Sequence, residues 1–104
     1  MEYDTQYPSQ EDLDKISSWE VKNFKEFRDI FEFVEKIWWQ PDWGIHKYDK
    51  EYHISTGGWS GNEDIIEAMR KNYILWRMCW VQSRRGGHYV FELPQHEIKE
   101  SHTE

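Results

Sequence analysis

The chain has almost no cysteine: Cys79 is the single one in 104 residues. One thiol excludes an internal disulfide and a zinc site built from cysteines alone, which fits a reducing compartment. No uninterrupted apolar run approaches the roughly 18 to 20 residues that a membrane-spanning helix needs. The first residues, MEYDTQYPSQEDL, lack the basic leader and apolar stretch of a signal peptide. We therefore expect a soluble, cytoplasmic protein with no membrane partner.

Basic residues are scarce relative to acids, since 13 Lys and Arg face 20 Asp and Glu, a formal net charge of -7. Phosphate repels such an acidic body, which argues against nonspecific binding of duplex nucleic acid. Only 38% of residues are hydrophobic, but 17% are aromatic, and large aromatic side chains favour a folded chain over disorder. The length suits one domain, residues 1–104, in which 1–18 and 95–104 are expected to be mobile or peripheral.

A long amphipathic helix is the first strong pattern. Apolar residues recur three and four positions apart, at Phe24, Phe27, Phe31, Val34 and Trp38. Asn23 is an N-cap type and Glu26 follows it by three, the spacing of a capping box. These features predict a helix over about 24–39 that stops at Pro41. Upstream, Pro8-Ser9 followed by Asp12 could cap a short helix.

The hydrophobic period then changes to two. From Trp43 onward apolar and polar residues alternate, which predicts a hairpin that turns at Asp49-Lys50. A glycine-rich segment, 56–63, leads into a second predicted helix of about 62–71.

A second hairpin closes the chain, with strands over 73–83 and 88–93. Gly86-Gly87 between them tolerates positive φ, which predicts a two-residue turn. Such a turn pairs Arg85 with His88, Arg84 with Tyr89, Ser83 with Val90 and Trp80 with Leu93. One face of the hairpin is then aromatic and belongs to the core, and it carries Ile74, Trp76, Met78, Trp80, Phe91 and Leu93. The other face is polar and carries Arg77, Cys79, Ser83, Arg85 and His88.

The predicted fold class is α+β: a four-stranded antiparallel sheet of two hairpins, with two main helices packed on one face. Its predicted core comprises Phe24, Phe27, Phe31, Val34, Ile54, Ile65, Met69, Trp76, Trp80 and Phe91.

The glycine-rich turn is the sharpest local signal. Gly57, Gly58, Trp59 and Ser60 precede a helix, whose N-terminal amides and dipole favour an anion. The alternative is structural, with Ser60 and Glu63 forming a capping box while the glycines only permit the turn. The segment has neither a Walker A ending nor the GxGxxG spacing of a dinucleotide fold.

The tip of the second hairpin is the other candidate. Arg84 and Arg85 could clamp a phosphate or carboxylate, with His88 beside them, and Tyr89 or Trp59 could stack on a base. The alternative is a charged tip that keeps the hairpin soluble. The turn and the tip can act together only if they lie at the same end of the sheet, or meet across an oligomer interface.

Three further features receive a structural interpretation first. His46 and His53 face each other in the first hairpin, with Glu51 nearby, but no diagnostic ligand spacing supports a metal. Trp38, Trp39 and Trp43 are assigned to core and helix-end packing, with a ligand cage as the alternative. Cys79 is expected to be an inert, half-buried thiol. No nucleophile, paired carboxylates or cofactor motif is apparent, so we expect no cofactor and do not favour an enzyme.

Three blocks resemble a known group of proteins: TGGWSGNEDIIEA at 56–68, NYILWRMCW at 72–80 and SRRGGHYVFE at 83–92. They are similar to short, largely uncharacterised proteins encoded by tailed bacteriophages and prophages. The resemblance implies an accessory phage product, such as a counter-defence factor, acting in the cytoplasm of the bacterial host. It implies no active site.

These patterns lead to two functional hypotheses. The first is a noncatalytic module that binds a small anionic, nucleotide-like ligand through the turn and the tip. The second is an acidic inhibitor of a host protein, since residues 1–35 hold ten acids and four bases. Glu26, Asp29 and Glu32 would present its carboxylates about one helical turn apart, although a solvated helix face explains them too. A metal-assisted hydrolase built on His46, His53 and His88 is a distant third.

Overall fold

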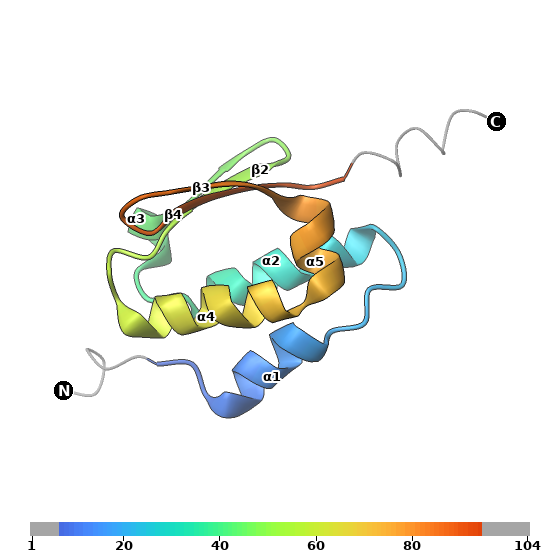
Figure 1. Ribbon diagram of the computed structural model, residues 1–104, viewed down its shortest axis with the longest axis horizontal. Helices are drawn as coiled ribbons and strands as arrows, with labels where there is room; N and C mark the ends of the chain where they lie inside the picture. The colour runs from blue at the N-terminus through green and yellow to red at the C-terminus, as the bar shows by residue number, and fades with distance from the viewer. Residues whose placement is uncertain (1–6, 95–104) are drawn as a thin grey trace.

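The computed structural model describes residues 7–94 and confirms the α+β class. Its elements are α1 (Gln10–Ser18), α2 (Lys25–Ile37), α3 (Pro41–Gly44), β1 (Ile45–Tyr48), β2 (Glu51–Ser55), α4 (Ser60–Lys71), α5 (Tyr73–Cys79), β3 (Trp80–Arg84) and β4 (His88–Glu92). The strands form one antiparallel sheet in the order β1-β2-β4-β3. The helices α1, α2 and α4 lie on the same side of this sheet (Figure 1). Within the described ranges, no helix is long and apolar enough to cross a membrane.

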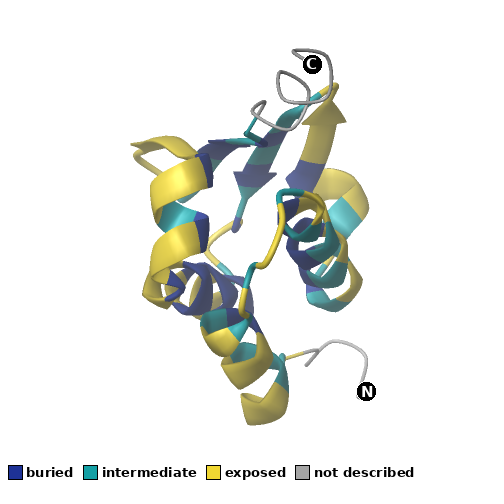
Figure 2. Cartoon of the chain, turned by 90° about the vertical axis from the view of Figure 1, so that its right-hand side faces the viewer, coloured by how far each residue is buried: buried dark blue, intermediate teal, exposed yellow. Residues whose placement is uncertain are grey.

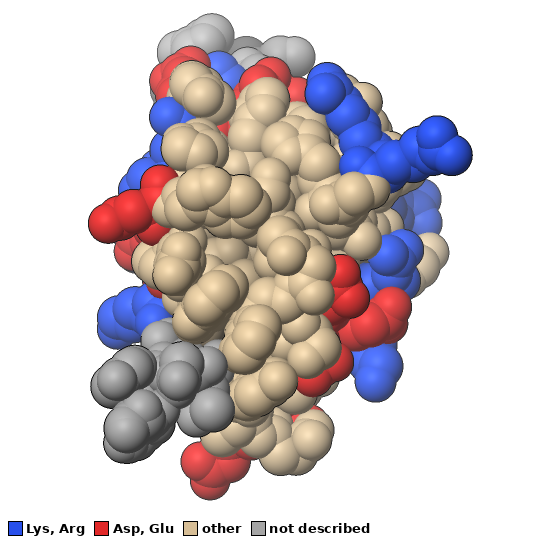
Figure 3. All heavy atoms as spheres, turned by 90° about the vertical axis from the view of Figure 1, so that its left-hand side faces the viewer, with Lys and Arg blue, Asp and Glu red and all other residues tan. Residues whose placement is uncertain are grey.

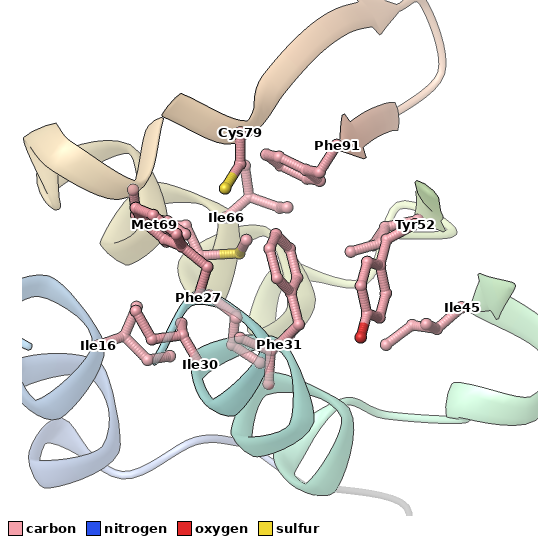
Figure 4. Close-up of a cluster of buried hydrophobic side chains, with 14 of the residues drawn as sticks. Ile16, Phe27, Ile30, Phe31, Ile45, Tyr52, Ile66, Met69, Cys79 and Phe91 are labelled. Carbon is pink, nitrogen blue, oxygen red and sulfur yellow. The ribbon is translucent and has the colours of Figure 1, made fainter. Parts of the chain in front are cut away.

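The core fills the space between the sheet and these helices (Figure 2). At its centre Phe31 of α2 stacks on Tyr52, with ring centroids 4.4 Å apart, and its ring centroid is 5.4 Å from that of Phe91 (Figure 4). Seven predicted core residues are buried: Phe27, Phe31, Val34, Ile54, Ile65, Met69 and Phe91. Phe24 and Trp76 pack against the core while partly exposed. The prediction for Trp80 is wrong, because its side chain is 42% exposed.

The predicted strand over 73–83 is wrong in its first half, where α5 stands instead. The side chain of Asn72 accepts a hydrogen bond from the backbone amide of Leu75 and so caps α5. Leu75 and Cys79, four residues apart, are buried, whereas Ile74 and Met78 are exposed. The inward face therefore follows the helical period, and the apparent alternation of apolar residues was misleading.

The turn of the second hairpin has three residues, 85–87, and not two. Gly86 and Gly87 adopt φ values of 84° and 77°, so both need the freedom of glycine. The longer turn shifts the register, and Arg84 pairs with His88, Ser83 with Tyr89, Gln82 with Val90 and Trp80 with Phe91. All four predicted pairs are therefore wrong: Arg85–His88, Arg84–Tyr89, Ser83–Val90 and Trp80–Leu93. The irregularity between Trp80 and Gln82 disrupts the two-residue alternation there.

The first hairpin is confirmed, because His46 pairs with His53 across a turn at Asp49-Lys50. Asp49 takes the left-handed conformation that this tight turn requires, with φ of 59°.

The predicted helix start is correct for α1 and wrong for α2. Ser9 and Asp12 form the expected capping box of α1. Residue Ile16 of this helix is fully buried. Helix α2, in contrast, has Phe24 and not Asn23 at its N-cap position. The side chain of Glu26 accepts a hydrogen bond from Trp19 Nε1 at 3.2 Å and forms no capping box with Asn23. Residues 1–6 and 95–104, part of the segments expected to be mobile or peripheral, lie outside the described residues.

Cys79 is more buried than expected, with 1% of its surface exposed, and burial raises the pKa of its thiol to about 12. A shift of that size above the ordinary value lowers the thiolate fraction at pH 8 by roughly 1,000-fold.

We expect a disulfide reagent such as Ellman's reagent to label the Cys79 thiol of the native protein at least about a hundredfold more slowly than that of the protein unfolded in guanidinium. Because Cys79 is the single cysteine, the Cys79→Ser variant has no thiol and gives the background signal of the assay. Equal labelling rates would contradict the burial.

Candidate functional site

The candidate site lies on the face of the sheet that points away from the helices. Ser55, His88 and Arg84 are direct partners across β2, β4 and β3, so they form one row of side chains. Residues at the alternate positions, such as Ile54, point into the core. We call Ser55, His88 and Arg84 the outer row.

His88, in the middle of the outer row, is hydrogen-bonded to Ser55 and has a lowered pKa. Ser55 Oγ lies 2.9 Å from His88 Nδ1 in a hydrogen bond, and the ring centroids of His53 and His88 are 6.0 Å apart. Desolvation lowers the pKa of His88, with further contributions from Arg84 and His53. The neutral form of His88 is therefore favoured, and its environment already contains positive charge.

The two tip arginines form the basic part of the outer face. Arg84 and Arg85 are both exposed. Within residues 7–94, no ion pair links either guanidinium to a carboxylate. At the other end of the same face Glu51 Oε1 lies 3.0 Å from His53 Nε2, and Glu51 pairs with Glu92 across the strands. The outer face is thus basic at the tip and acidic at the far end.

The two motifs singled out in the sequence lie at the same end of the sheet. The amide of Thr56, directly before the glycine-rich turn, donates a 3.0 Å hydrogen bond to the carbonyl of Gly87 in the tip. The spatial condition for joint action within one chain is therefore met.

Two amides of the glycine-rich turn are engaged in hydrogen bonds within the turn. Thr56 Oγ1 accepts from the Gly58 amide at 3.2 Å and donates to Glu63 Oε2 at 3.3 Å. The Thr56 carbonyl accepts from the Trp59 amide. Helix α4 begins at Ser60, whose hydroxyl donates to the Tyr7 hydroxyl, so the predicted Ser60–Glu63 capping box is wrong. With two amides engaged and a carboxylate at the turn, this segment is less suited to an anion than the outer row.

Both rings predicted to stack on a base are engaged in packing. Trp59 is half-buried and stacks on Trp39 and Tyr7, with centroids 4.5 and 5.0 Å away. Tyr89 points to the core side of the sheet, where its ring centroid is 6.4 Å from those of both Trp76 and Phe91. Tyr89 is therefore separated from Arg84 and His88 by the sheet itself.

Trp43 is the aromatic residue at this end whose importance the sequence analysis missed. Trp38 is buried, as the core assignment predicted, but Trp43 is 59% exposed. The end of the molecule with α3, the turn and the tip shows a broad surface without charged side chains, with both basic and acidic side chains at its edge (Figure 3). The available signal was that Trp43 lies two residues after Pro41, a residue type that favours the start of a helix, and only two residues before a strand.

The other candidates are not assembled into a site. His46 Nε2 donates to the carbonyl of Trp43 at 3.0 Å, and His53 contacts Glu51. Across residues 7–94, no group of three or more His, Cys, Asp or Glu side chains could hold a metal ion.

Two of the acidic side chains of α2 contact neighbouring residues. Glu26 accepts a hydrogen bond from Trp19, and Asp29 lies 3.7 Å from Lys25 Nζ, while Glu32 is exposed. Two of the three carboxylates proposed to contact a host protein therefore already have partners.

No protein-family model matches the chain, and neither a curated protein nor a solved structure matches it.

Proposed function

We propose that this chain is a noncatalytic module that binds a small anionic, nucleotide-like ligand, with the ligand phosphate at the outer row. The observation that carries the proposal is the alignment of Ser55, His88 and Arg84 on the open face of the sheet. Arginine binds phosphate oxygens through a fixed fork of donors, and the hydrogen-bonded pair of Ser55 and neutral His88 keeps one further donor, on the hydroxyl or on the imidazole according to the tautomer. Arg85 in the adjacent turn adds a second positive charge.

The local chemistry supports binding more than turnover. Ser55 and His88 have the spacing of a nucleophile and its base. The neighbouring carboxylate Glu51, however, contacts His53 and not His88. The Thr56 amide, which could stabilise an oxyanion beside Ser55, is already bonded to the tip. Among the residues that the structure describes, neither the Glu51 carboxylate nor the Thr56 amide is thus available to support the pair as it would in a hydrolase.

The biological setting is part of the same proposal. A phage accessory protein in the bacterial cytoplasm would use such a site to sequester a small host signal, which requires affinity but no chemistry. A soluble globule with an acidic body and a local basic end suits this role, because the basic end alone attracts the ligand.

Replacing Arg84 with alanine is expected to weaken anion binding about tenfold or more, through loss of about 1.5–3 kcal/mol of charged hydrogen bonding. Calorimetry with inorganic pyrophosphate and with mono-, di- and cyclic nucleotides measures this change, and chromatography tests whether any ligand is consumed. Arg77→Ala is the matched control, because Arg77 is also exposed but lies on α5 and donates to the Tyr73 hydroxyl.

Two results would overturn this proposal. One is the absence of saturable binding by any of these anions, which would shift attention to an acidic inhibitor acting through Glu26, Asp29 and Glu32. The other is an equal loss of affinity in Arg84→Ala and Arg77→Ala, which would indicate a general charge effect. Consumption of a ligand would contradict the noncatalytic assignment.

A further inference from the structure

We infer that Trp43 is the ring on which the base of a nucleotide stacks when the phosphate occupies the outer row. This inference rests on the proposed function and specifies its ligand as a nucleotide that spans the end of the sheet. It replaces the two stacking rings suggested by the sequence, Trp59 and Tyr89, both of which are engaged in packing.

Trp43 combines an exposed ring with a fixed backbone. Its amide donates to the Gln40 carbonyl at 3.2 Å, and its carbonyl accepts from His46 Nε2. The next residue, Gly44, is buried so tightly that an added Cβ would lie 2.7 Å from the Ser55 carbonyl oxygen. An aromatic ring held in position yet mostly in water offers a large apolar contact at low entropic cost.

Trp43 lies at the same end of the sheet as the tip. Its ring lies against Gly57, and the Thr56 amide directly before this glycine donates to the carbonyl of Gly87 in the tip. Ser55, the residue before Thr56, pairs with His88 of the outer row. The segment 55–57 therefore connects the exposed ring with the outer row.

The glycine-rich turn supports the ring. The six-membered ring of Trp43 lies so close to Gly57 that a Cβ there would approach it to 2.9 Å, and Gly57 adopts φ of 66°. Glycine at position 57 thus permits both the positive φ of the turn and the close packing of the Trp43 ring against its backbone. The end of the molecule that holds α3, the turn and the tip presents a broad area of uncharged side chains (Figure 3), which suits a neutral base.

The experiment compares two ligand classes on two variants. Calorimetry measures the affinities of inorganic pyrophosphate, ADP and GDP for the wild type, Trp43→Ala and Arg84→Ala. Since stacking of a base on an aromatic ring contributes about 1–3 kcal/mol, Trp43→Ala should weaken ADP and GDP binding by roughly 5- to 150-fold. It should leave pyrophosphate binding unchanged, whereas Arg84→Ala should weaken all three.

Two control variants make the result specific. Trp80→Ala removes another exposed tryptophan, at the opposite edge strand β3, and should change no affinity. Trp43→Phe keeps a smaller ring and should retain most of the nucleotide affinity.

The outcomes distinguish this inference from the proposed function. Suppose that Trp43→Ala binds ADP and GDP as tightly as the wild type while Arg84→Ala weakens the binding of all three ligands. The base then does not stack on Trp43, and the anion site at the outer row is supported. If Trp43→Ala weakens pyrophosphate as much as the nucleotides, Trp43 has a structural role and the inference fails. If neither pyrophosphate nor a nucleotide binds the wild type, the proposed function itself fails.

Discussion

Phe31→Ala is expected to lower the free energy of unfolding by about 3–5 kcal/mol, because it removes a large ring from the centre of the core. Phe31 is 1% exposed and lies between the sheet and the helices, in ring contact with Tyr52 and Phe91 (Figure 4). Its removal loses apolar burial and leaves a cavity that two aromatic neighbours cannot fill without moving. A domain of ordinary stability has only about 5–15 kcal/mol to lose.

Guanidinium unfolding followed by circular dichroism measures the change. Phe31→Leu keeps most of the apolar volume and should cost clearly less than alanine. Tyr48→Ala removes an exposed aromatic side chain on β1 and should change stability by no more than about 0.5 kcal/mol. A loss below about 1 kcal/mol in Phe31→Ala would contradict the placement of this ring at the centre of the core.

Local patterns predicted the elements whose determinants are local. The repeat of Phe27, Phe31 and Val34 identified α2 because all three face one core. The first hairpin was predictable because its turn and its alternation lie within a few residues of each other.

The parts that were wrong depend on distant or cumulative effects. Residues 73–79 are rich in residues that favour strands, yet Asn72 starts a helix there while its side chain also binds the end of α1. In the second hairpin, one additional turn residue changed the partner of every strand position.

The candidate site shows the same division. The sequence identified Arg84, Arg85 and His88 as chemically notable, but their alignment with Ser55 depends on pairing between β2 and β4, 33 residues apart for Ser55 and His88. Trp43 looked like core because aromatic clusters usually pack together. Its exposure is set by the short α3, which no hydrophobic period predicts.

Asn72→Ala is expected to lower the free energy of unfolding by about 2–4 kcal/mol, because it leaves three backbone groups without their partner. Asn72 is 4% exposed. Its Nδ2 donates to the carbonyls of Ile16 and Trp19 at 2.8 and 3.1 Å, and its Oδ1 accepts from the Leu75 amide at 3.1 Å. One side chain therefore joins the end of α1 to the start of α5, more than 50 residues along the chain.

Asn72→Asp separates the two roles of this side chain. The carboxylate keeps an acceptor for the Leu75 amide, but it loses both donors and places negative charge against two carbonyl oxygens. If capping of α5 were the whole contribution, the aspartate variant would unfold like the wild type, since aspartate is as good an N-cap as asparagine. We expect it instead to be at least as unstable as Asn72→Ala in guanidinium unfolding.

Asn23→Ala is the matched control. Asn23 is exposed and precedes the N-cap of α2, so its replacement should change the free energy of unfolding by no more than about 0.5 kcal/mol. Wild-type stability of Asn72→Asp would show that the bonds to Ile16 and Trp19 contribute nothing to the fold.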